Sequence, residues 1–191
     1  GTLKFAAGGQ YAGAWSNGRM TGAGKMTYAN GDCFTGEFSG DNCRVNGRGS
    51  MAYANRDVYD GQWSNDEKCG SGIMKFQNGN VYDGQWKANL ACGKGCMTYL
   101  LGNTYDGQWD QGLQNGQGMM LFADGNKYSG CWSQGVKSGA GKMEYWQGYT
   151  FAGQWANDDR LPGPGSMVYA NGDKYVGNWD ANKEMSGEGT M

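Results

Sequence analysis

The pentapeptide YDGQW occupies Tyr59–Trp63, and it returns at Tyr82–Trp86 and at Tyr105–Trp109. Each copy begins 23 residues after the one before it. Self-similarity at a fixed period of this length is the sequence signature of a repeat architecture. The extent of the repeat therefore decides the fold, and it has to be established before any single residue is given a role.

The repeat covers the whole chain. Alignment on the first aromatic residue gives eight units, which begin at Tyr11, Phe34, Tyr59, Tyr82, Tyr105, Tyr128, Phe151 and Tyr175. Each unit has the pattern aromatic-x-Gly-x-aromatic, then a polar segment, then Gly-x-Gly-x-Met-x-aromatic and a turn. Residues 1–10 fit the second half of a truncated unit, and the last unit is truncated at residue 191. We therefore expect one continuous repeat domain that is a fragment of a longer repeat protein.

Both halves of each unit alternate with period two, which is typical of β-strands. Tyr11, Gly13 and Trp15 would share one face of a strand, and the segment 22–28 would form the next strand. A helix is excluded because no apolar spacing of three or four residues persists and glycine recurs in every segment. The Asn-Gly or Asp-Gly pairs between units predict tight hairpin turns. The longer segment within each unit, such as the one after Trp15, is expected to absorb insertions.

The glycines, 37 of 191 residues, have a structural use in such a sheet. A bulky ring needs lateral room, and a glycine in the neighbouring strand lets the ring lie over backbone. A lone hairpin is marginal in water, so successive hairpins must stack to bury their rings. The sequence thus predicts an all-β fold, an elongated single-layer twisted ribbon of consecutive antiparallel β-hairpins.

The stretch YDGQWSNDEKCGSGIMKFQNGNVYDGQW at residues 59–86 resembles the MORN (membrane occupation and recognition nexus) repeat, whose pattern is Y-x-G-x-W, a gap, then G-x-G-x-M-x-Y. Phe38 replaces tryptophan in the second unit, and ANRD at residues 54–57 lacks the turn glycine, so local irregularity is expected there. The resemblance implies the same ribbon of hairpins. An array without a second domain looks most like the all-MORN cytoskeletal scaffold proteins of protists, which self-associate.

Composition excludes several classes of function. The sequence contains no histidine, which removes the commonest general base and every Ser-His or Cys-His arrangement. We therefore expect no catalytic residues, no enzymatic activity and no cofactor. The net charge of −2, with interspersed signs, argues against nucleic acid as a partner. The sequence has no apolar run of about 20 residues and no signal-peptide pattern, so a cytoplasmic location is expected.

The cysteines are expected to be free thiols, as is usual in cytoplasmic proteins. They are Cys33, Cys43, Cys69, Cys92, Cys96 and Cys131. Cys69 and Cys92 hold equivalent positions in successive units, about 10 Å apart by strand spacing, which exceeds the reach of a disulfide. Cys92 and Cys96 would lie about 13 Å apart in an extended segment, too far for zinc within one chain. No metal site is expected, although a site shared across a dimer stays open.

A stripe of aromatic and methionine side chains is the first candidate binding site. Two interpretations stay open: the side chains pack the sheet, or they line a groove that receives a helix or an extended peptide. The candidate groove residues are Tyr11, Trp15, Tyr28, Tyr59, Trp63, Tyr82, Trp86, Met97, Tyr99, Tyr105, Trp109, Tyr128, Trp132, Met143, Tyr145, Trp155, Met167, Tyr169, Tyr175 and Trp179.

Basic residues near the loops within units are the second candidate site, a rim for phosphoinositide headgroups. They are Arg19, Arg44, Lys68, Lys87, Lys137 and Arg160. The alternative is that these are ordinary solvated loop charges, and acidic neighbours such as Asp158 and Asp159 favour it.

The sequence favours a non-enzymatic scaffold that binds cytoskeletal proteins and a second copy of itself. The homodimer would form through the C-terminal repeats, where insertions and the segment LPGPG at residues 161–165 alter the pattern. The resemblance leaves two alternatives open, a phosphoinositide-binding membrane tether and the positioning module of an enzyme that lies outside this fragment.

Overall fold

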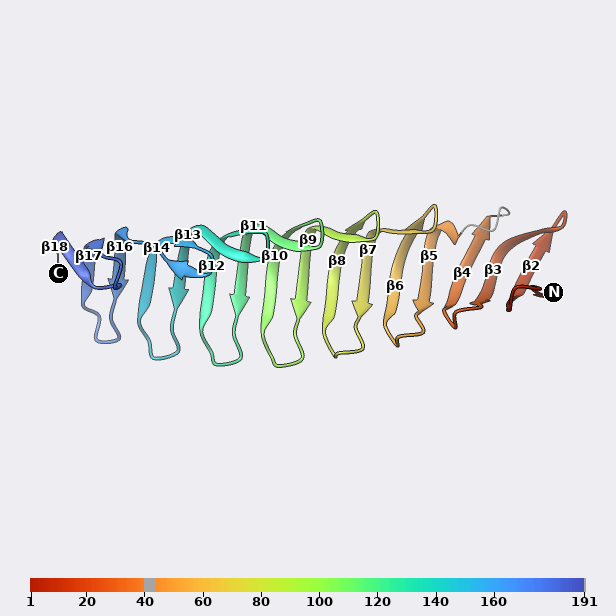
Figure 1. The fold of residues 1–191 in the computed structure, drawn as a ribbon, viewed down its shortest axis with the longest axis horizontal. Coiled ribbons are helices and arrows are strands. Elements are labelled where there is room, and N and C mark those ends of the chain that lie inside the picture. The colour runs from red at the N-terminus through yellow and green to blue at the C-terminus, as the bar shows by residue number, and fades with distance from the viewer. Residues whose placement is uncertain (40–43, 191) are drawn as a thin grey trace. The chain divides into compact units, whose positions relative to one another are not determined.

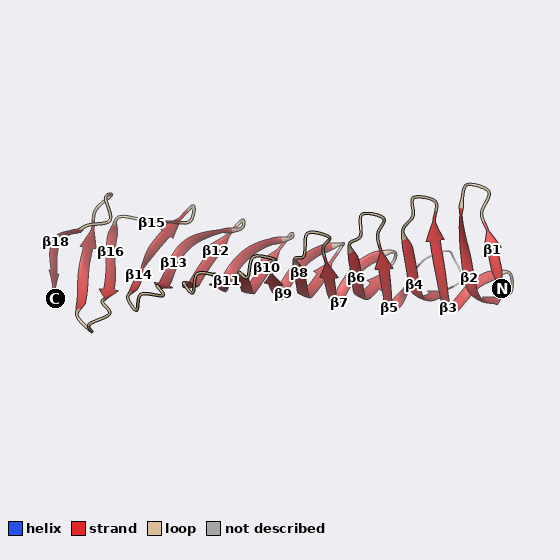
Figure 2. Ribbon diagram, turned by 90° about the horizontal axis from the view of Figure 1, so that it is seen from below, coloured by secondary structure: helices blue, strands red, loops and turns tan. Residues whose placement is uncertain are grey.

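The structure is a computed structural model that describes residues 1–39 and 44–190, and for residues 44–46 it describes the backbone only. The described residues form strands, turns and loops, as Figure 2 shows. They contain no helix that is long and apolar enough to cross a membrane. The chain divides into two compact units, Gly1–Gly93 and Lys94–Met191. Each is considered by itself below.

Unit 1 is an open antiparallel sheet in which each strand pairs with its sequence neighbours. Its strands are β1 (Thr2–Lys4), β2 (Gly9–Ser16), β3 (Arg19–Tyr28), β4 (Cys33–Ser39), β5 (Arg44–Ala52), β6 (Val58–Ser64), β7 (Glu67–Lys75) and β8 (Val81–Lys87), and the first residues of β9 (Leu90–Thr98) also belong to it. Figure 1 shows this order along the chain.

Unit 2 repeats the same arrangement after the end of β9. Its strands are β10 (Thr104–Asp110), β11 (Leu113–Leu121), β12 (Lys127–Ser133), β13 (Val136–Glu144), β14 (Thr150–Ala156), β15 (Asp159–Arg160), β16 (Gly163–Val168), β17 (Lys174–Trp179) and β18 (Met185–Thr190). Consecutive strands pair antiparallel, and β14 pairs with both β15 and β16. The predicted all-β fold of consecutive antiparallel hairpins is confirmed.

The two kinds of turn are the reverse of the prediction. The tight turn lies inside the sequence repeat. For example, only Asn17 and Gly18 separate β2 from β3, with φ of 49° and 76°. Two consecutive positive φ values are typical of a type I′ hairpin turn. The turn between successive repeats is longer: residues 29–32 separate β3 from β4. There the Gly31 N–H donates to the Tyr28 carbonyl at 3.0 Å, and Gly31 alone takes a positive φ.

A β-bulge explains why the segment between the two halves of each sequence repeat looks like a long loop in the sequence. Gly13 pairs with Gly24, but the next residue, Ala14, pairs with Thr21, so β3 carries two extra residues. Gly22 lies in this bulge with a φ of 59°. Simple alternation along the predicted strand at residues 22–28 would place Gly22 and Gly24 on one face, but the first glycine lies in the bulge and only the second faces the aromatic rings.

The described insertions follow the prediction only in part. In unit 2 the turn after Trp155 keeps two residues, Asn157 and Asp158, and the extra residue lies at 161–162, where it separates β15 from β16. The other insertion lengthens the turn between β17 and β18, as expected. The insertion predicted at residues 39–46 lies largely outside the described residues.

The glycines seat the aromatic rings, as predicted. The Tyr11 ring lies over Gly13 of its own strand and Gly24 of the paired strand, and Tyr11 is 0% exposed. A Cβ atom on Gly24 would stand only 2.5 Å from Cε2 of Tyr11. Tyr59, Tyr105 and Tyr128 repeat this arrangement, each with no exposed surface. A methyl group at the second glycine would therefore have to displace a fully buried ring.

We predict that Gly118→Ala lowers the free energy of unfolding by about 3 kcal/mol, because a Cβ there would lie 2.5 Å from Cζ of Tyr105. Gly47→Ala is the matched control, since its Cβ would meet nothing nearer than Glu37 Oε2 at 3.9 Å. The control should change stability by no more than about 1 kcal/mol. Urea denaturation followed by tryptophan fluorescence measures both, and equal effects would contradict the seating of the ring.

The turn at residues 54–57 is regular although it lacks the glycine, so the expected irregularity is absent. Arg56 takes the glycine's conformation, with a φ of 74°, and its N–H donates to the Tyr53 carbonyl at 2.9 Å. The hydrogen bonds of the turn thus hold a non-glycine residue in the left-handed region, which costs about 1 kcal/mol.

Arg56→Gly should therefore raise the free energy of unfolding by about 1 kcal/mol in urea denaturation. Arg56→Ala is the control, because alanine keeps the Cβ atom that makes the conformation unfavourable. If the alanine variant gains as much stability as the glycine variant, backbone strain at this turn is not the cause.

Candidate functional site

The buried aromatic residues form a ladder of edge-to-face contacts. Tyr59 touches Trp63 of its own repeat at 5.1 Å between ring centroids and Trp86 of the next repeat at 5.2 Å. Tyr128 does the same with Trp132 and Trp155. The aromatic ladder consists of Tyr11, Trp15, Phe34, Phe38, Tyr59, Trp63, Tyr82 and Trp86 in unit 1, and of Tyr105, Trp109, Tyr128, Trp132, Phe151, Trp155, Tyr175 and Trp179 in unit 2.

The polar atoms of the ladder are bound to the backbone. The Tyr59 hydroxyl donates to the Gln62 carbonyl at 3.0 Å, three residues further along the chain. The indole N–H of Trp86 donates to the Gly72 carbonyl of the preceding hairpin at 2.9 Å. Both bonds recur at equivalent positions in other repeats. Because buried donors are costly to leave unpaired, these bonds lock each ring to its neighbours.

Most residues of the predicted groove are buried in this ladder. The buried members are Tyr11, Tyr59, Trp63, Tyr82, Trp86, Tyr105, Trp109, Tyr128, Trp132, Met143, Trp155, Met167, Tyr175 and Trp179. Tyr28, Met97, Tyr99, Tyr145 and Tyr169 are half-buried, and Trp15 is 36% exposed. Packing accounts for the buried members, so a partner could reach only Trp15 and the half-buried side chains of the stripe.

A second set of residues covers the ladder, and the sequence analysis missed its role. These residues follow the two-residue turn and pair with the tryptophan of the same hairpin: Met20, Lys68, Gln114, Lys137 and Arg160, here called the lid column. Lys68 Nζ lies 4.6 Å from the Trp86 centroid and 5.6 Å from the Tyr59 centroid. The sequence did not identify this lid, because the pairing of Lys68 with Trp63 follows from the two-residue turn, which the prediction had placed elsewhere.

Three of the six predicted headgroup ligands belong to this lid column. Lys137 Nζ lies 4.9 Å from the Trp155 centroid, so Lys137, like Lys68, points at rings. Burial lowers the pKa of both amines. Arg160 lies over Phe151 at 4.5 Å. Arg19 and Lys87 are exposed, and the Arg44 side chain lies outside the described residues. Cation–π contact thus accounts for half of the predicted rim.

The opposite face of the sheet carries a row of carboxylates and the cysteines. Asp60 and Asp83 pair with Ile73 from either side. Cys33, Cys69, Cys92, Cys96 and Cys131 are half-buried thiols that form no disulfide, and Cys43 lies outside the described residues. Within the part of the chain that the structure describes, no three metal-ligating side chains gather.

Large exposed apolar side chains stand instead on two of the turns between repeats in unit 2. Leu100 is 68% exposed, Leu101 is 83% exposed and Trp146 is 66% exposed. Adjacent turns are linked, since Asn103 Oδ1 accepts from the Ala123 N–H at 2.9 Å and Asn126 Oδ1 accepts from the Trp146 N–H at 3.0 Å. Leu100, Leu101, Ala123 and Trp146 are here called the turn-edge patch.

Comparison with family models finds the MORN repeat at residues 11–33, 59–81, 82–99, 105–127, 128–145 and 151–174. No curated protein matches the chain. Among solved structures, the TCP domain of SAS-4 from Drosophila melanogaster, in complex with a proline-rich motif of Ana2, is 15% identical with a TM-score of 0.50, over 86% of this chain and 94% of that one. The TCP10 domain of Danio rerio CPAP, in complex with a STIL peptide, is 15% identical with a TM-score of 0.43, over 99% and 92%. At these identities the likeness concerns the fold alone.

Alkaline pH should destabilise the protein through the ladder. Burial raises the pKa of Tyr105 to about 12, and it raises the pKa of Tyr59, Tyr82 and Tyr128 in the same direction. Unfolded tyrosine titrates near pH ~10. The folded state therefore keeps the tyrosine hydroxyls protonated at pH values where the unfolded chain has lost these protons. The stability that the neutral tyrosines contribute is complete below pH ~10, and it is lost as the pH rises toward the folded pKa values.

We expect the urea midpoint to fall steeply above pH ~10 while tyrosinate absorbance shows that the folded rings stay protonated. Tyr105→Phe should reduce the pH dependence of the midpoint by the contribution of one titrating group. The variant should fold, since phenylalanine already occupies the equivalent position at Phe34 and Phe151. The lowered pKa values of Lys68 and Lys137 act in the opposite direction, and two lysines do not offset four tyrosines. A midpoint that stays level through pH ~11 would contradict this account.

Proposed function

The chain belongs to the MORN repeat family, and from this premise we propose that it is a non-enzymatic scaffold that binds other proteins, including a second copy of itself. Most ladder and lid residues are used for packing, so we expect function on the turns and at breaks in the repeat. Neither the family match nor the structural neighbours indicate an enzyme family.

The turn-edge patch is the observation that carries this proposal. In the other turns between repeats the same two positions hold Ala29-Asn30, Ala54-Asn55, Gln77-Asn78, Ala123-Asp124 and Ala170-Asn171. The fold therefore does not require Leu100, Leu101 or Trp146 there. Large apolar side chains that stay exposed without an internal role are typical of protein interfaces, and tryptophan is enriched at interface hot spots.

The fold neighbours support the class of function. The Drosophila melanogaster domain was solved with a proline-rich motif bound, so a sheet of this kind can present a surface to a peptide. The cytoskeletal setting of the proposal rests on the resemblance to the all-MORN scaffolds. No observation favours the phosphoinositide alternative, because Lys68, Lys137 and Arg160 lie over aromatic rings.

The test replaces the apolar residues of the patch with the residues found at the same positions in other turns of the chain. The changes Leu100→Ala, Leu101→Asn and Trp146→Ala are combined in one variant. We expect the melting temperature to stay level while the dissociation constant for self-association, measured by sedimentation velocity, rises by about tenfold or more.

The matched control replaces exposed apolar residues away from the patch and from the C-terminal repeats, with Ile73→Thr and Leu90→Thr combined, and should leave association unchanged. A wild-type chain that is strictly monomeric at high micromolar concentration would overturn the self-association part of the proposal. Equal association of the patch variant and the wild type would exclude the patch as its surface.

A further inference from the structure

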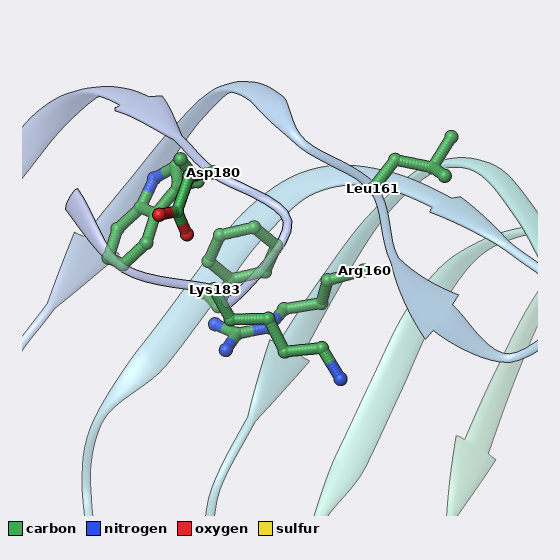
Figure 3. Close-up of a pocket in the computed structure, with 6 residues that line it drawn as sticks. Arg160, Leu161, Asp180 and Lys183 are labelled. Atoms are coloured by element: carbon green, nitrogen blue, oxygen red, sulfur yellow. The ribbon is translucent and has the colours of Figure 1, made fainter. Parts of the chain in front are cut away.

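A small pocket in unit 2 lies where the sequence departs furthest from the repeat. It is lined by Phe151, Arg160, Leu161, Trp179, Asp180 and Lys183, here called the Arg160 pocket. Arg160 comes from β15 and Lys183 from the turn after β17, and Figure 3 shows both among the side chains that line the pocket. Arg160 stands beside the inserted Leu161-Pro162 segment, and Lys183 lies in the lengthened turn.

The pocket holds two unpaired donors. Among the described residues that are not exposed, the buried side-chain nitrogens and oxygens without a hydrogen-bond partner are Arg160 Nη1 and Trp179 Nε1, and both residues line this pocket. Trp179 is 7% exposed. Buried N–H groups are ordinarily paired in folded proteins, so two orphans in one place indicate a missing acceptor.

The orphan indole results from the local break in the repeat. Five ladder tryptophans donate to the glycine carbonyl 14 residues earlier, at 2.9 to 3.2 Å. For Trp179 that glycine is Gly165, but the β14–β16 pairing ends at Ala152 and Ser166 and does not reach it. The preceding Pro164 has no N–H to extend the pairing. Gly165 keeps the usual register with β17, where it pairs with Gly177, so the break lies on its other side, where its pairing with β14 is missing.

Arg160 differs from the other cations of the lid column. Its guanidinium lies 4.5 Å from the Phe151 centroid and 5.8 Å from the Trp179 centroid. A guanidinium stacked on a ring keeps its in-plane N–H groups for an oxygen acceptor. The neighbouring carboxylates are already engaged: Asp159 pairs with Lys183 at 2.5 Å, and Asp180 Oδ1 accepts from the N–H groups of Asn182 and Glu184, both at 2.9 Å.

We propose that the Arg160 pocket binds a carboxylate of a partner's extended acidic segment, with the Arg160 guanidinium as its main ligand and the Trp179 indole N–H as a second donor to the same segment. This inference rests on the proposed function and specifies the chemistry of one partner. Charge complementarity carries it, because the half-buried Arg160 leaves Nη1 without a hydrogen-bond partner, and an anion forms the strongest hydrogen bonds with a guanidinium.

The pocket must open to receive this segment. Its lining side chains leave no room for a water molecule between them. The covering groups are the ones easiest to move: Leu161 is 44% exposed, and the Lys183–Asp159 pair has side chains 41% and 66% exposed. Exposed ion pairs contribute little to stability. The incoming carboxylate can therefore displace Asp159 from Lys183 and reach Arg160 beneath.

The test titrates the whole chain with a blocked tetraglutamate peptide and, separately, with blocked tetraglutamine. Binding is followed by the indole N–H signals in nitrogen-15 correlation spectra, with the Trp179 signal assigned through Trp179→Phe. We expect tetraglutamate to shift the Trp179 signal, added salt to weaken the binding, and tetraglutamine to have no effect.

Arg160→Gln and Lys137→Gln form a matched pair, because Gln114 already holds the same lid position in another repeat. Arg160→Gln should weaken tetraglutamate binding by about tenfold or more, and Lys137→Gln should leave it unchanged. In each free variant, unchanged indole signals from the tryptophans away from the substitution confirm folding.

Three results would overturn the proposal: no Trp179 shift at millimolar tetraglutamate, an equal shift with tetraglutamine, or equal weakening by the two variants. An equal response to tetraglutamine would point instead to an uncharged peptide carbonyl as the ligand. Self-association through the turn-edge patch is measured on the same Arg160→Gln sample. Its persistence would show that the scaffold proposal stands or fails independently of this pocket.

Discussion

The contact of a tyrosine or phenylalanine ring with two glycines is the constraint on which the rest of the structure depends. The ring of Tyr11 occupies the space that side chains at Gly13 and Gly24 would need, so each hairpin has one bulky ring and a bare stretch of backbone beneath it. Such a ring is fully covered only when the tryptophan of the next repeat packs against its edge, as Trp86 does on Tyr59. Stability therefore comes from the succession of repeats, because one hairpin cannot bury its own ring.

That constraint also limits what the protein can do. The tyrosine hydroxyls and most indole N–H groups are used to fix the ladder, and Lys68 and Lys137 are used to cover it. Residue types that would suggest a headgroup site or an aromatic peptide groove are consumed by packing. What remains for recognition is the set of positions that the repeat does not need, on the turns and at breaks in the register.

A repeat protein supplies its own reference for recognising such positions. Trp146 stands where another turn has Ala123, and Arg160 stands where another hairpin has Gln114, although the backbone positions are equivalent. Because the fold is satisfied by the smaller or neutral residue, the departure needs a cause outside the fold. The turn-edge patch and the Arg160 pocket are both departures of this kind, one apolar and exposed, the other cationic and covered.

The sequence by itself determined the period, the strands and the seating of rings on glycine, because these follow from alternation and from the absence of side chains at regular intervals. It did not determine which turn is tight: SNGRMT looks like a loop, but only Asn17 and Gly18 form the turn and its other four residues belong to β2 and β3, which only the pairing shows. Nor could it show that Lys68 covers a ring while Lys87 is exposed, since both follow a tryptophan closely. The direction of a long side chain and the loss of an acceptor for Trp179 depend on the neighbouring hairpin, and tertiary structure alone decided them.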